Sequence, residues 1–243
     1  MTHAPVPVED ADVHTASPEY ATRFAGRVGA WFLEVQARIT LELLTPWPQA
    51  TVLDVGGGHG QLTGPLLDAG CRVTVHGTSD ACAGRIQADL AAGRVRFQSG
   101  PLLALPWADR SFDVVLAFRL LPHVERWRAL VAELCRVARH AVVFDYPTRR
   151  SVNLLSDALF GMKKEVEGNT RPFRVFSEGE IDDALAAASF VTRARRPEFT
   201  VPMALHRAMG RASLSRALEG TAAAVGLTSI VGSPVVRRAE PVP

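Results

Sequence analysis

Apolar positions along this chain follow two different spacing patterns. Between residues 18 and 44 they recur every three or four positions, at Phe24, Val28, Trp31, Phe32, Val35, Ile39 and Leu43. This spacing predicts a helix. Gly26 and Gly29 are positions at which the helix can divide in two, and Pro46 and Pro48 end it. Residues 1–17 show no period and predict a mobile tail.

From residue 50 the apolar positions form short continuous runs separated by helical stretches. We expect strands over 50–55, 71–76, 95–98, 111–118 and 140–145, with helices ending near Ala69 and covering 80–92 and 124–138. Fully apolar strands that alternate with helices indicate a parallel sheet covered on both faces.

After Asp145 this alternation is interrupted. We expect a helix over 151–166, a polar loop over 167–176, a helix over 178–188, a strand over 190–195, helix over 203–225 and a last strand over 229–237. Residues 147–176 therefore look like a cap inserted at the carboxyl edge of the sheet, where open α/β sheets bind ligands.

Composition narrows the classes of protein to which this chain can belong. The chain has 243 residues, 27 Lys and Arg against 25 Asp and Glu, a net charge of +2, and 47% hydrophobic residues. A chain this apolar can bury a core, and a charge this small gives no broad field for nucleic acid or an anionic membrane. Only Lys163 and Lys164 are lysines, and the 25 arginines are scattered, which indicates coding bias rather than RNA binding.

Cys71, Cys82 and Cys135 form no CxxC pair, so they predict neither a disulfide framework nor a zinc site. No His, Asp and Glu pair has metal-ligand spacing on one element, so we expect no metal. The first residues carry acidic side chains and no apolar run, and no stretch is long enough to span a membrane. These features predict a soluble, cytoplasmic protein.

A glycine loop follows the first predicted strand. It reads Asp54-Val55-Gly56-Gly57-Gly58-His59-Gly60 and opens the next helix. Glycines let the backbone turn and let a ligand approach, and a helix N-terminus offers unpaired N–H groups. The spacing fits neither GxGxxG nor the P-loop, which disfavours dinucleotides and excludes a P-loop nucleotide site. It fits Asp-x-Gly-x-Gly-x-Gly.

This loop, together with Leu105-Pro106-Trp107-Ala108-Asp109-Arg110-Ser111-Phe112-Asp113 and Leu120-Leu121-Pro122-His123-Val124, resembles the class I S-adenosylmethionine-dependent methyltransferases of small molecules, similar to those of quinone biosynthesis. The resemblance spans about residues 50–145. It implies a Rossmann-like sheet of seven mostly parallel strands, the last antiparallel, with helices on both faces. We expect one domain, made of a helical lid (18–48), a cofactor-binding core (49–146), the cap (147–176) and closing elements (177–243).

The same resemblance implies the cofactor S-adenosylmethionine and its binding residues. The methionine end of the cofactor would lie over the glycine loop, the ribose at the end of the second strand, the adenine after the third strand and the sulfonium near the turn after the fourth. The corresponding residues, together with Tyr20 of the lid, are Asp54, Gly56, Gly57, Gly58, Gly60, Gly77, Thr78, Ser79, Pro101, Leu102, Leu103, Phe118 and Arg119. His59 is placed to touch the methionine carboxylate, and Trp107 either closes over adenine or packs in the core.

Two positions depart from the family's pattern. The family usually has Asp or Glu, which accepts hydrogen bonds from the ribose, where this chain has Gly77, and often has Asp at the adenine where this chain has Pro101. Thr78, Ser79 or Asp80 are candidate substitutes. Three interpretations follow: binding of S-adenosylmethionine through altered contacts, binding of another nucleoside or metabolite, or a non-catalytic partner subunit.

Candidate catalytic residues lie after the fourth and fifth strands. His123 is either a general base or a residue that lines the cofactor, because an imidazole suits proton transfer near neutral pH. Asp145 either orients a base or substrate or braces a loop, and Tyr146 shares its edge of the sheet. The expected reaction is methyl transfer to oxygen or carbon of a small, lipophilic or aromatic metabolite, with no nucleic-acid partner and no stable membrane insertion.

Candidate substrate-binding residues lie beyond the cofactor core. Arg171 and Arg174 of the cap either hold a carboxylate or phosphate of the acceptor or belong to a solvated loop. With Lys163 and Lys164 nearby, they predict a local basic patch and an anionic acceptor. His206 either covers the pocket or belongs to the core. A fold that binds a nucleoside-type ligand or a partner without catalysis is the alternative function.

Overall fold

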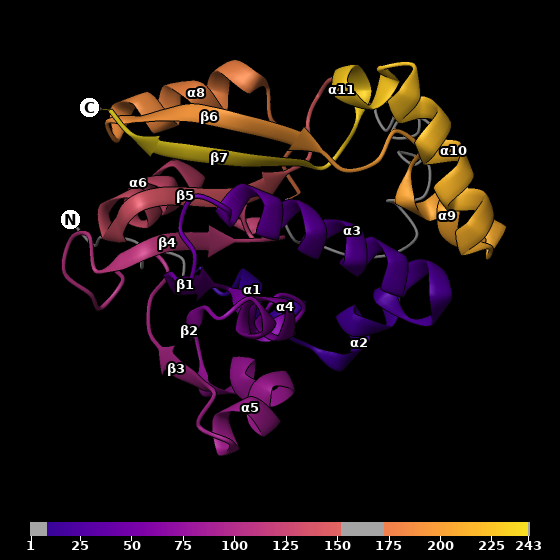
Figure 1. Cartoon of the computed structure of the whole chain (residues 1–243). Helices are drawn as coiled ribbons and strands as arrows, with labels where there is room; N and C mark the ends of the chain where they lie inside the picture. The colour runs from indigo at the N-terminus through magenta and orange to yellow at the C-terminus, as the bar shows by residue number, and fades with distance from the viewer. Residues whose placement is uncertain (1–8, 152–172, 243) are drawn as a thin grey trace, which may run out of the picture.

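A computed structural model describes residues 9–151 and 173–242 (Figure 1). Seven strands form one sheet in the order β3-β2-β1-β4-β5-β7-β6. The strands are β1 (Thr51–Val55), β2 (Arg72–Gly77), β3 (Val95–Ser99), β4 (Phe112–Ala117), β5 (Ala138–Tyr146), β6 (Phe190–Pro197) and β7 (Val235–Pro241). The pairings from β3 across to β5 are parallel, and β7 is antiparallel to both β5 and β6. The predicted sheet, with its last strand antiparallel, is confirmed.

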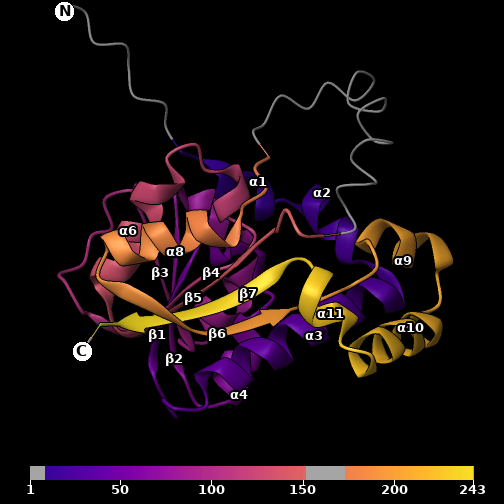
Figure 2. The same cartoon turned by 90° about the horizontal axis from the view of Figure 1, so that it is seen from above.

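Helices cover both faces of this sheet (Figure 2). The α-helices are α1 (Ala11–Thr15), α2 (Pro18–Ala21), α3 (Gly26–Leu44), α4 (Thr63–Asp68), α5 (Gln87–Ala91), α6 (Trp127–Val137), α8 (Glu178–Ala187), α9 (Met203–Met209), α10 (Ala212–Ala224) and α11 (Leu227–Val231). The short 3-10 helices are η1 (Thr22–Phe24), η2 (Gly57–His59), η3 (Asp80–Ile86) and η4 (Leu121–His123). No helix among the residues described here combines the length and the apolar character needed to cross a bilayer.

Each face has its own core. One core joins β1, β4 and β5 to α6 and α8, with Trp127 and Leu185 among its buried residues. The other joins the opposite face to α3 and α4, through Ile39, Leu43 and Leu66. The 3.6-residue spacing of α3 is what turns these apolar side chains to one side. A third cluster, around Phe32 and Phe199, ties α3 to the C-terminal helices.

The structure differs from the predicted elements near both ends of the chain. Residues 11–15 form α1, with Ala11, Asp12 and Thr15 buried, where a mobile tail was predicted. The last strand begins at Val235, because residues 227–231 form α11. The expected helix over 151–166 and most of the expected cap lie outside the described residues.

Candidate active site

The glycine loop has the backbone conformation that its sequence requires. Gly56 and Gly60 flank η2 with φ of 75° and 74°, a region that side-chain-bearing residues rarely adopt. Between them Gly57 and Gly58 leave no room for a Cβ. An added Cβ would lie 2.1 Å from Asp54 Oδ2 at Gly57, and 2.3 Å from the Cys82 carbonyl oxygen at Gly58. The loop therefore depends on close backbone approach.

Asp54 lies near the end of β1, the strand that leads into this loop. Its carboxyl group is buried against Gly57, and burial raises its pKa to about 7.

His59 and Gln61 follow the glycines of the loop. His59 is buried, and its ring meets those of Tyr20 and Phe24 edge-on at 5.9 and 5.4 Å. Burial, followed by the charges of Arg119 and Arg85, lowers the pKa of His59 to about 4, and the Gln61 side chain beside it opposes this lowering. His59 therefore ties the loop to the aromatic residues of the N-terminal helices.

The end of β2 carries the predicted ribose site. The Thr78 amide and hydroxyl both donate to the carboxylate of Asp12, at 2.6 Å each. Ser79 precedes η3. Asp12 was not predicted, because it lies in the segment expected to be a tail.

The predicted adenine residues have different surroundings. Leu102 is buried in the core, Leu103 and Trp107 pack against that core, and Pro101 is exposed. The Trp107 ring meets His76 at 5.3 Å. Phe118 is buried in the core on the other face of the sheet from Leu102.

A cavity of about 320 Å³ lies beside the loop, at the carboxyl edge of β4, β5 and β6. Its lining includes four of the predicted residues, Tyr20, Arg119, His123 and Asp145. The remaining lining residues are Arg23, Phe24, Pro122, Pro147, Phe173, Glu198, Met203, Arg207, Ser233 and Pro234. Tyr20 and Phe24 contact both His59 and this cavity, so they join the loop to it.

Arg119 and Asp145 both line this cavity and contact each other. Arg119 follows β4 with φ of 57°, and its amide donates to Asp145 Oδ1 at 2.6 Å. Its guanidinium carbon lies 3.8 Å from the Phe24 ring centroid, and its Nη1 is buried with no partner among the described residues. Burial raises the pKa of Asp145 to about 6, opposed by Arg119, so this carboxylate is ionised at neutral pH.

Glu198 is a cavity residue that sequence analysis missed. It follows β6, and because β6 and β5 both run antiparallel to β7, their carboxyl ends meet at one edge. Gln36 Nε2 donates to Glu198 Oε1 at 3.3 Å. Burial and then the charge of Asp145 raise the pKa of Glu198 to about 8, against the opposing charge of Arg119. A Glu directly after a predicted strand was the available signal, but the position of that strand in the sheet is not local information.

Several predicted residues do not belong to this cavity. Tyr146 is buried, and its hydroxyl donates to Glu178 at 3.0 Å. His206 is buried among Trp31, Phe32 and Phe199, with its Nε2 2.9 Å from Glu219 Oε1. Arg174 is paired with Glu180 at 2.5 Å on the surface. Arg171 and the two lysines lie outside the described residues.

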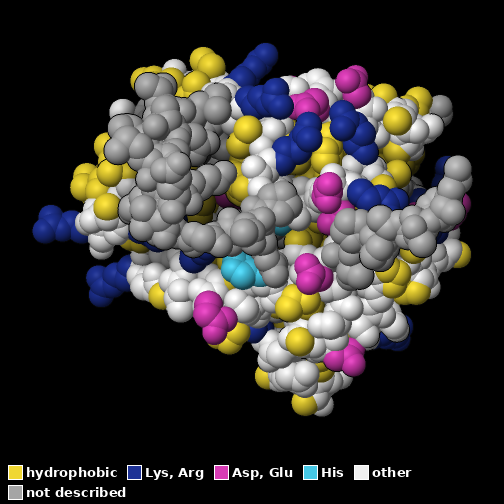
Figure 3. Space-filling model, turned by 180° about the vertical axis from the view of Figure 1, so that it is seen from behind, with side chains coloured by type: hydrophobic (Ala, Val, Ile, Leu, Met, Phe, Trp, Pro, Cys, Tyr) yellow, Lys and Arg dark blue, Asp and Glu magenta, His cyan; other side chains and the backbone are white. Residues whose placement is uncertain are grey.

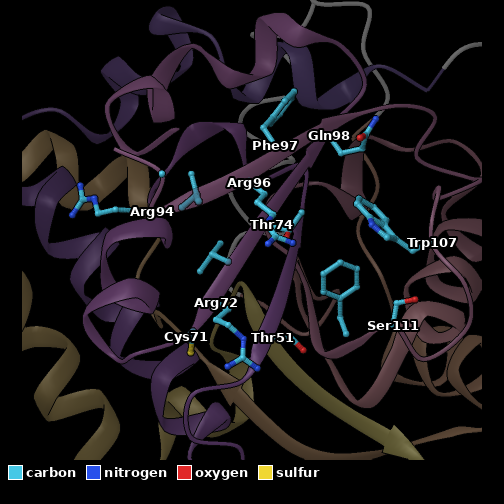
Figure 4. Close-up of a pocket in the computed structure, with 14 residues that line it drawn as sticks. Thr51, Cys71, Arg72, Thr74, Arg94, Arg96, Phe97, Gln98, Trp107 and Ser111 are labelled. Carbon is cyan, nitrogen blue, oxygen red and sulfur yellow. The ribbon is translucent and has the colours of Figure 1, made fainter. Parts of the chain in front are cut away.

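A larger hollow, of about 650 Å³, lies along β2 and β3 (Figure 4). Its lining extends from Thr51 and Arg72, at the starts of β1 and β2, to Gln98 near the end of β3, and it includes Trp107. On the face seen in Figure 3, basic and acidic side chains are intermixed around the described surface.

No group of three or more His, Cys, Asp or Glu side chains is arranged to hold a metal ion within residues 9–151 and 173–242. The three cysteines are free and buried.

Comparisons with known proteins agree with this geometry. Residues 53–144 match a family described as a methyltransferase domain. An uncharacterized methyltransferase of Mycobacterium avium is 38% identical over 92 residues, which are 37% of this chain and 35% of that protein. A ubiquinone/menaquinone biosynthesis C-methyltransferase of Methylobacterium nodulans is 40% identical over 95 residues, 35% of this chain and 36% of that protein. The chain thus matches about a third of the length of these relatives.

Among solved structures, magnesium protoporphyrin IX methyltransferase of Synechocystis PCC 6803 with bound S-adenosylhomocysteine has the same fold. The TM-score is 0.67 at 15% sequence identity, over 96% of this chain and 98% of that one.

Proposed function

Because residues 53–144 of this chain are a methyltransferase domain in a protein with the class I, Rossmann-like fold, we propose that the protein transfers the methyl group of S-adenosylmethionine to oxygen or carbon of a small metabolite. The observation that carries this proposal is the position of the glycine loop, joined through Tyr20 and Phe24 to a cavity with paired carboxyl groups. Fold similarity alone would not indicate a reaction.

The residues at the loop suit such a cofactor. The backbone of residues 56–60, the His59 side chain and the polar groups after β2 would hold it, with Leu103 and Trp107 beside the adenine. When bound, S-adenosylmethionine supplies an electrophilic methyl group. Methyl transfer then requires mainly that the acceptor atom is held in line and that its proton is removed.

The cavity offers groups for both tasks. Asp145 is ionised near neutral pH and would accept the acceptor's proton, whereas Glu198 keeps its own proton and would donate a hydrogen bond from its hydroxyl. His123 lines the same cavity and is the second candidate base. Tyr146 is left out of this proposal because Glu178 holds its hydroxyl in the core.

The charges of the cavity favour an anionic acceptor. Arg23, Arg119 and Arg207 line it, and at neutral pH Asp145 is the ionised carboxylate facing them while Glu198 is protonated. Tyr20, Phe24 and Phe173 add aromatic surface. We propose an acceptor with a carboxylate or phosphate and an apolar or aromatic part, because guanidinium groups pair with planar anions and aromatic rings with apolar groups.

Isothermal titration of the protein with S-adenosylmethionine and S-adenosylhomocysteine tests the cofactor. We expect saturable heat for both, and no heat up to millimolar ligand would contradict the proposal. Mass spectrometry of small molecules that copurify would narrow the acceptor.

A specific variant tests the anionic acceptor once one is found. Arg207→Ala should raise the acceptor KM about tenfold, because the acceptor loses roughly one charge-assisted hydrogen bond. The affinity for S-adenosylhomocysteine should stay unchanged. Arg216→Ala, which removes an exposed arginine paired with Glu34, is the matched control. Equal losses for acceptor and cofactor, or no change, would argue against this role.

The second candidate function is binding of a nucleoside-type ligand without methyl transfer. The absence of a carboxylate at Gly77 and Pro101 favours it. Saturable binding of S-adenosylhomocysteine, with no methyl transfer to any copurified metabolite, would support this alternative.

A further inference from the structure

Residue 77 is a glycine and has no carboxylate, but a carboxylate from another element lies beside it. Asp12 of α1 is 1% exposed and lies at the end of β2. The Thr78 amide donates to its Oδ2 at 2.6 Å, the Thr78 hydroxyl to its Oδ1 at 2.6 Å, and the Cys82 thiol to its Oδ2 at 3.3 Å.

Gly77 and the Asp12 carboxylate lie directly beside each other. A Cβ added to Gly77 would lie 3.3 Å from Asp12 Oδ2 and 2.6 Å from the Cys82 Cβ. A side chain at residue 77 therefore does not fit while Cys82 and Asp12 are in place. The Asp12 carboxylate lies next to the point from which an acidic side chain at residue 77 would extend.

The surroundings of α1 fix it in this position. The carboxylate of Glu9, just before α1, accepts the amides of Glu125 and Arg126 at 3.2 and 2.9 Å. Ala11 belongs to the core that covers β1 and β4, and Ala16 lies 3.0 Å from the place of a Cβ at Gly58. Contacts on three sides make this a built position for Asp12.

We propose that Asp12 supplies, from the N-terminal helix, the carboxylate that accepts hydrogen bonds from the ribose hydroxyls of the adenosyl cofactor. This inference rests on the proposed function. A carboxylate has about four acceptor positions, and three donors use them here. One acceptor position is therefore free, and the thiol is a weak donor that a ribose hydroxyl displaces, so two ribose hydroxyls are accepted while the Thr78 amide and hydroxyl keep Asp12 in place.

Titration calorimetry on the full chain tests this proposal. The probes are S-adenosylhomocysteine and its 2′-deoxyribose analogue, and the proteins are wild type, Asp12→Asn and Asp10→Asn. Asp12→Asn keeps the size of the side chain and removes its charge. Asp10→Asn removes the same charge from the exposed residue that precedes α1, and serves as the matched control.

We expect Asp12→Asn to weaken the binding of S-adenosylhomocysteine by about 10- to 100-fold, because a charge-assisted hydrogen bond is lost. The control should bind like wild type. Wild type should prefer the ribose over the 2′-deoxy probe by about tenfold, and Asp12→Asn should lose most of this preference.

Three results would overturn the inference while the proposed function stands. Equal affinity of Asp12→Asn and wild type would show that Asp12 is not used. Tighter binding by Asp12→Asn would show that α1 obstructs the cofactor site. Weaker binding with the ribose preference intact would show a role in folding only. If neither wild type nor Asp12→Asn binds, the proposed function fails, and the inference with it.

Hydrogen exchange of wild type gives a measurement that needs no variant. S-adenosylhomocysteine should slow exchange at the amides of residues 13–17 and at Thr78. Faster exchange at residues 13–17 on binding would mean that α1 leaves the site, which would overturn the proposal.

Discussion

At the scale of single residues, burial decides which carboxyl groups carry a charge in the active-site cavity. Glu198 and Asp145 lie at the same edge of the sheet, and burial raises the pKa of both, to about 8 and about 6. Between those values one group is ionised and its neighbour is not. Such a separation of pKa values is how neighbouring carboxyl groups acquire different chemical roles.

Glu198→Gln tests this assignment through stability. The pKa of Glu198 is higher in the folded than in the unfolded protein, so the unfolded state loses this proton first as pH rises, and wild-type stability falls between about pH 4.5 and pH 8. Glu198→Gln has no carboxyl proton at this position, so its stability does not fall for this reason as pH rises. At pH 8 its free energy of unfolding, relative to wild type, should exceed the value at pH 5 by at least about 1 kcal/mol.

Urea unfolding at both pH values measures the effect. Glu34→Gln, which changes an exposed carboxylate, is the control and should give parallel curves. If Glu198→Gln also runs parallel to wild type, the raised pKa of Glu198 is wrong.

At the scale of elements, local signals and sheet position together explain each helix. Helix α8 begins with a capping box, in which the Ser177 hydroxyl accepts the Glu180 amide and the Glu180 carboxylate accepts the Ser177 amide. The helix predicted over 178–188 therefore starts at a signal that is local in the sequence, the Ser-x-x-Glu pattern. The 3-10 helix η3 lacks such a pattern, and a regular helix was expected there.

Ser177→Ala should lower the free energy of unfolding by about 1 kcal/mol, because the Glu180 amide loses its partner. A shift of the urea midpoint at unchanged slope measures it. Ser213→Ala, at an exposed position inside α10, should change stability by less than about 0.5 kcal/mol. Equal effects of the two variants would contradict the capping role.

At the scale of the whole molecule, segments from both ends of the chain complete the site. Helix α3 and the C-terminal segment meet at Phe32 and Phe199, whose rings are 5.0 Å apart. Helix α2, which precedes α3, supplies Tyr20 to the cavity, and the C-terminal segment supplies Glu198. The cluster around Phe32 therefore ties the N-terminal helices to the C-terminal segment beside the cavity.

Phe32→Ala should destabilise the protein by about 3–5 kcal/mol, as removal of a fully buried aromatic ring does. Thermal unfolding followed by circular dichroism measures it. Leu218→Ala, which truncates an exposed apolar side chain of α10, is the control and should lie within about 1 kcal/mol of wild type. A small loss for Phe32→Ala would mean that the lid is only loosely coupled to the C-terminal helices.

Sequence alone determined the parts of this protein that depend on neighbouring residues. The period of apolar positions predicted β1 to β5 and α3, and the spacing of Asp54, Gly56, Gly58 and Gly60 predicted the loop, since turns and alternation are local properties. The tertiary structure decided which residues meet across the sheet. Glu198 reaches the cavity because β7 is inserted between β5 and β6, and Asp12 meets Thr78 because α1 lies on the end of β2. Burial, which sets the pKa values of Asp145 and Glu198, likewise comes from long-range packing that no short stretch of sequence contains.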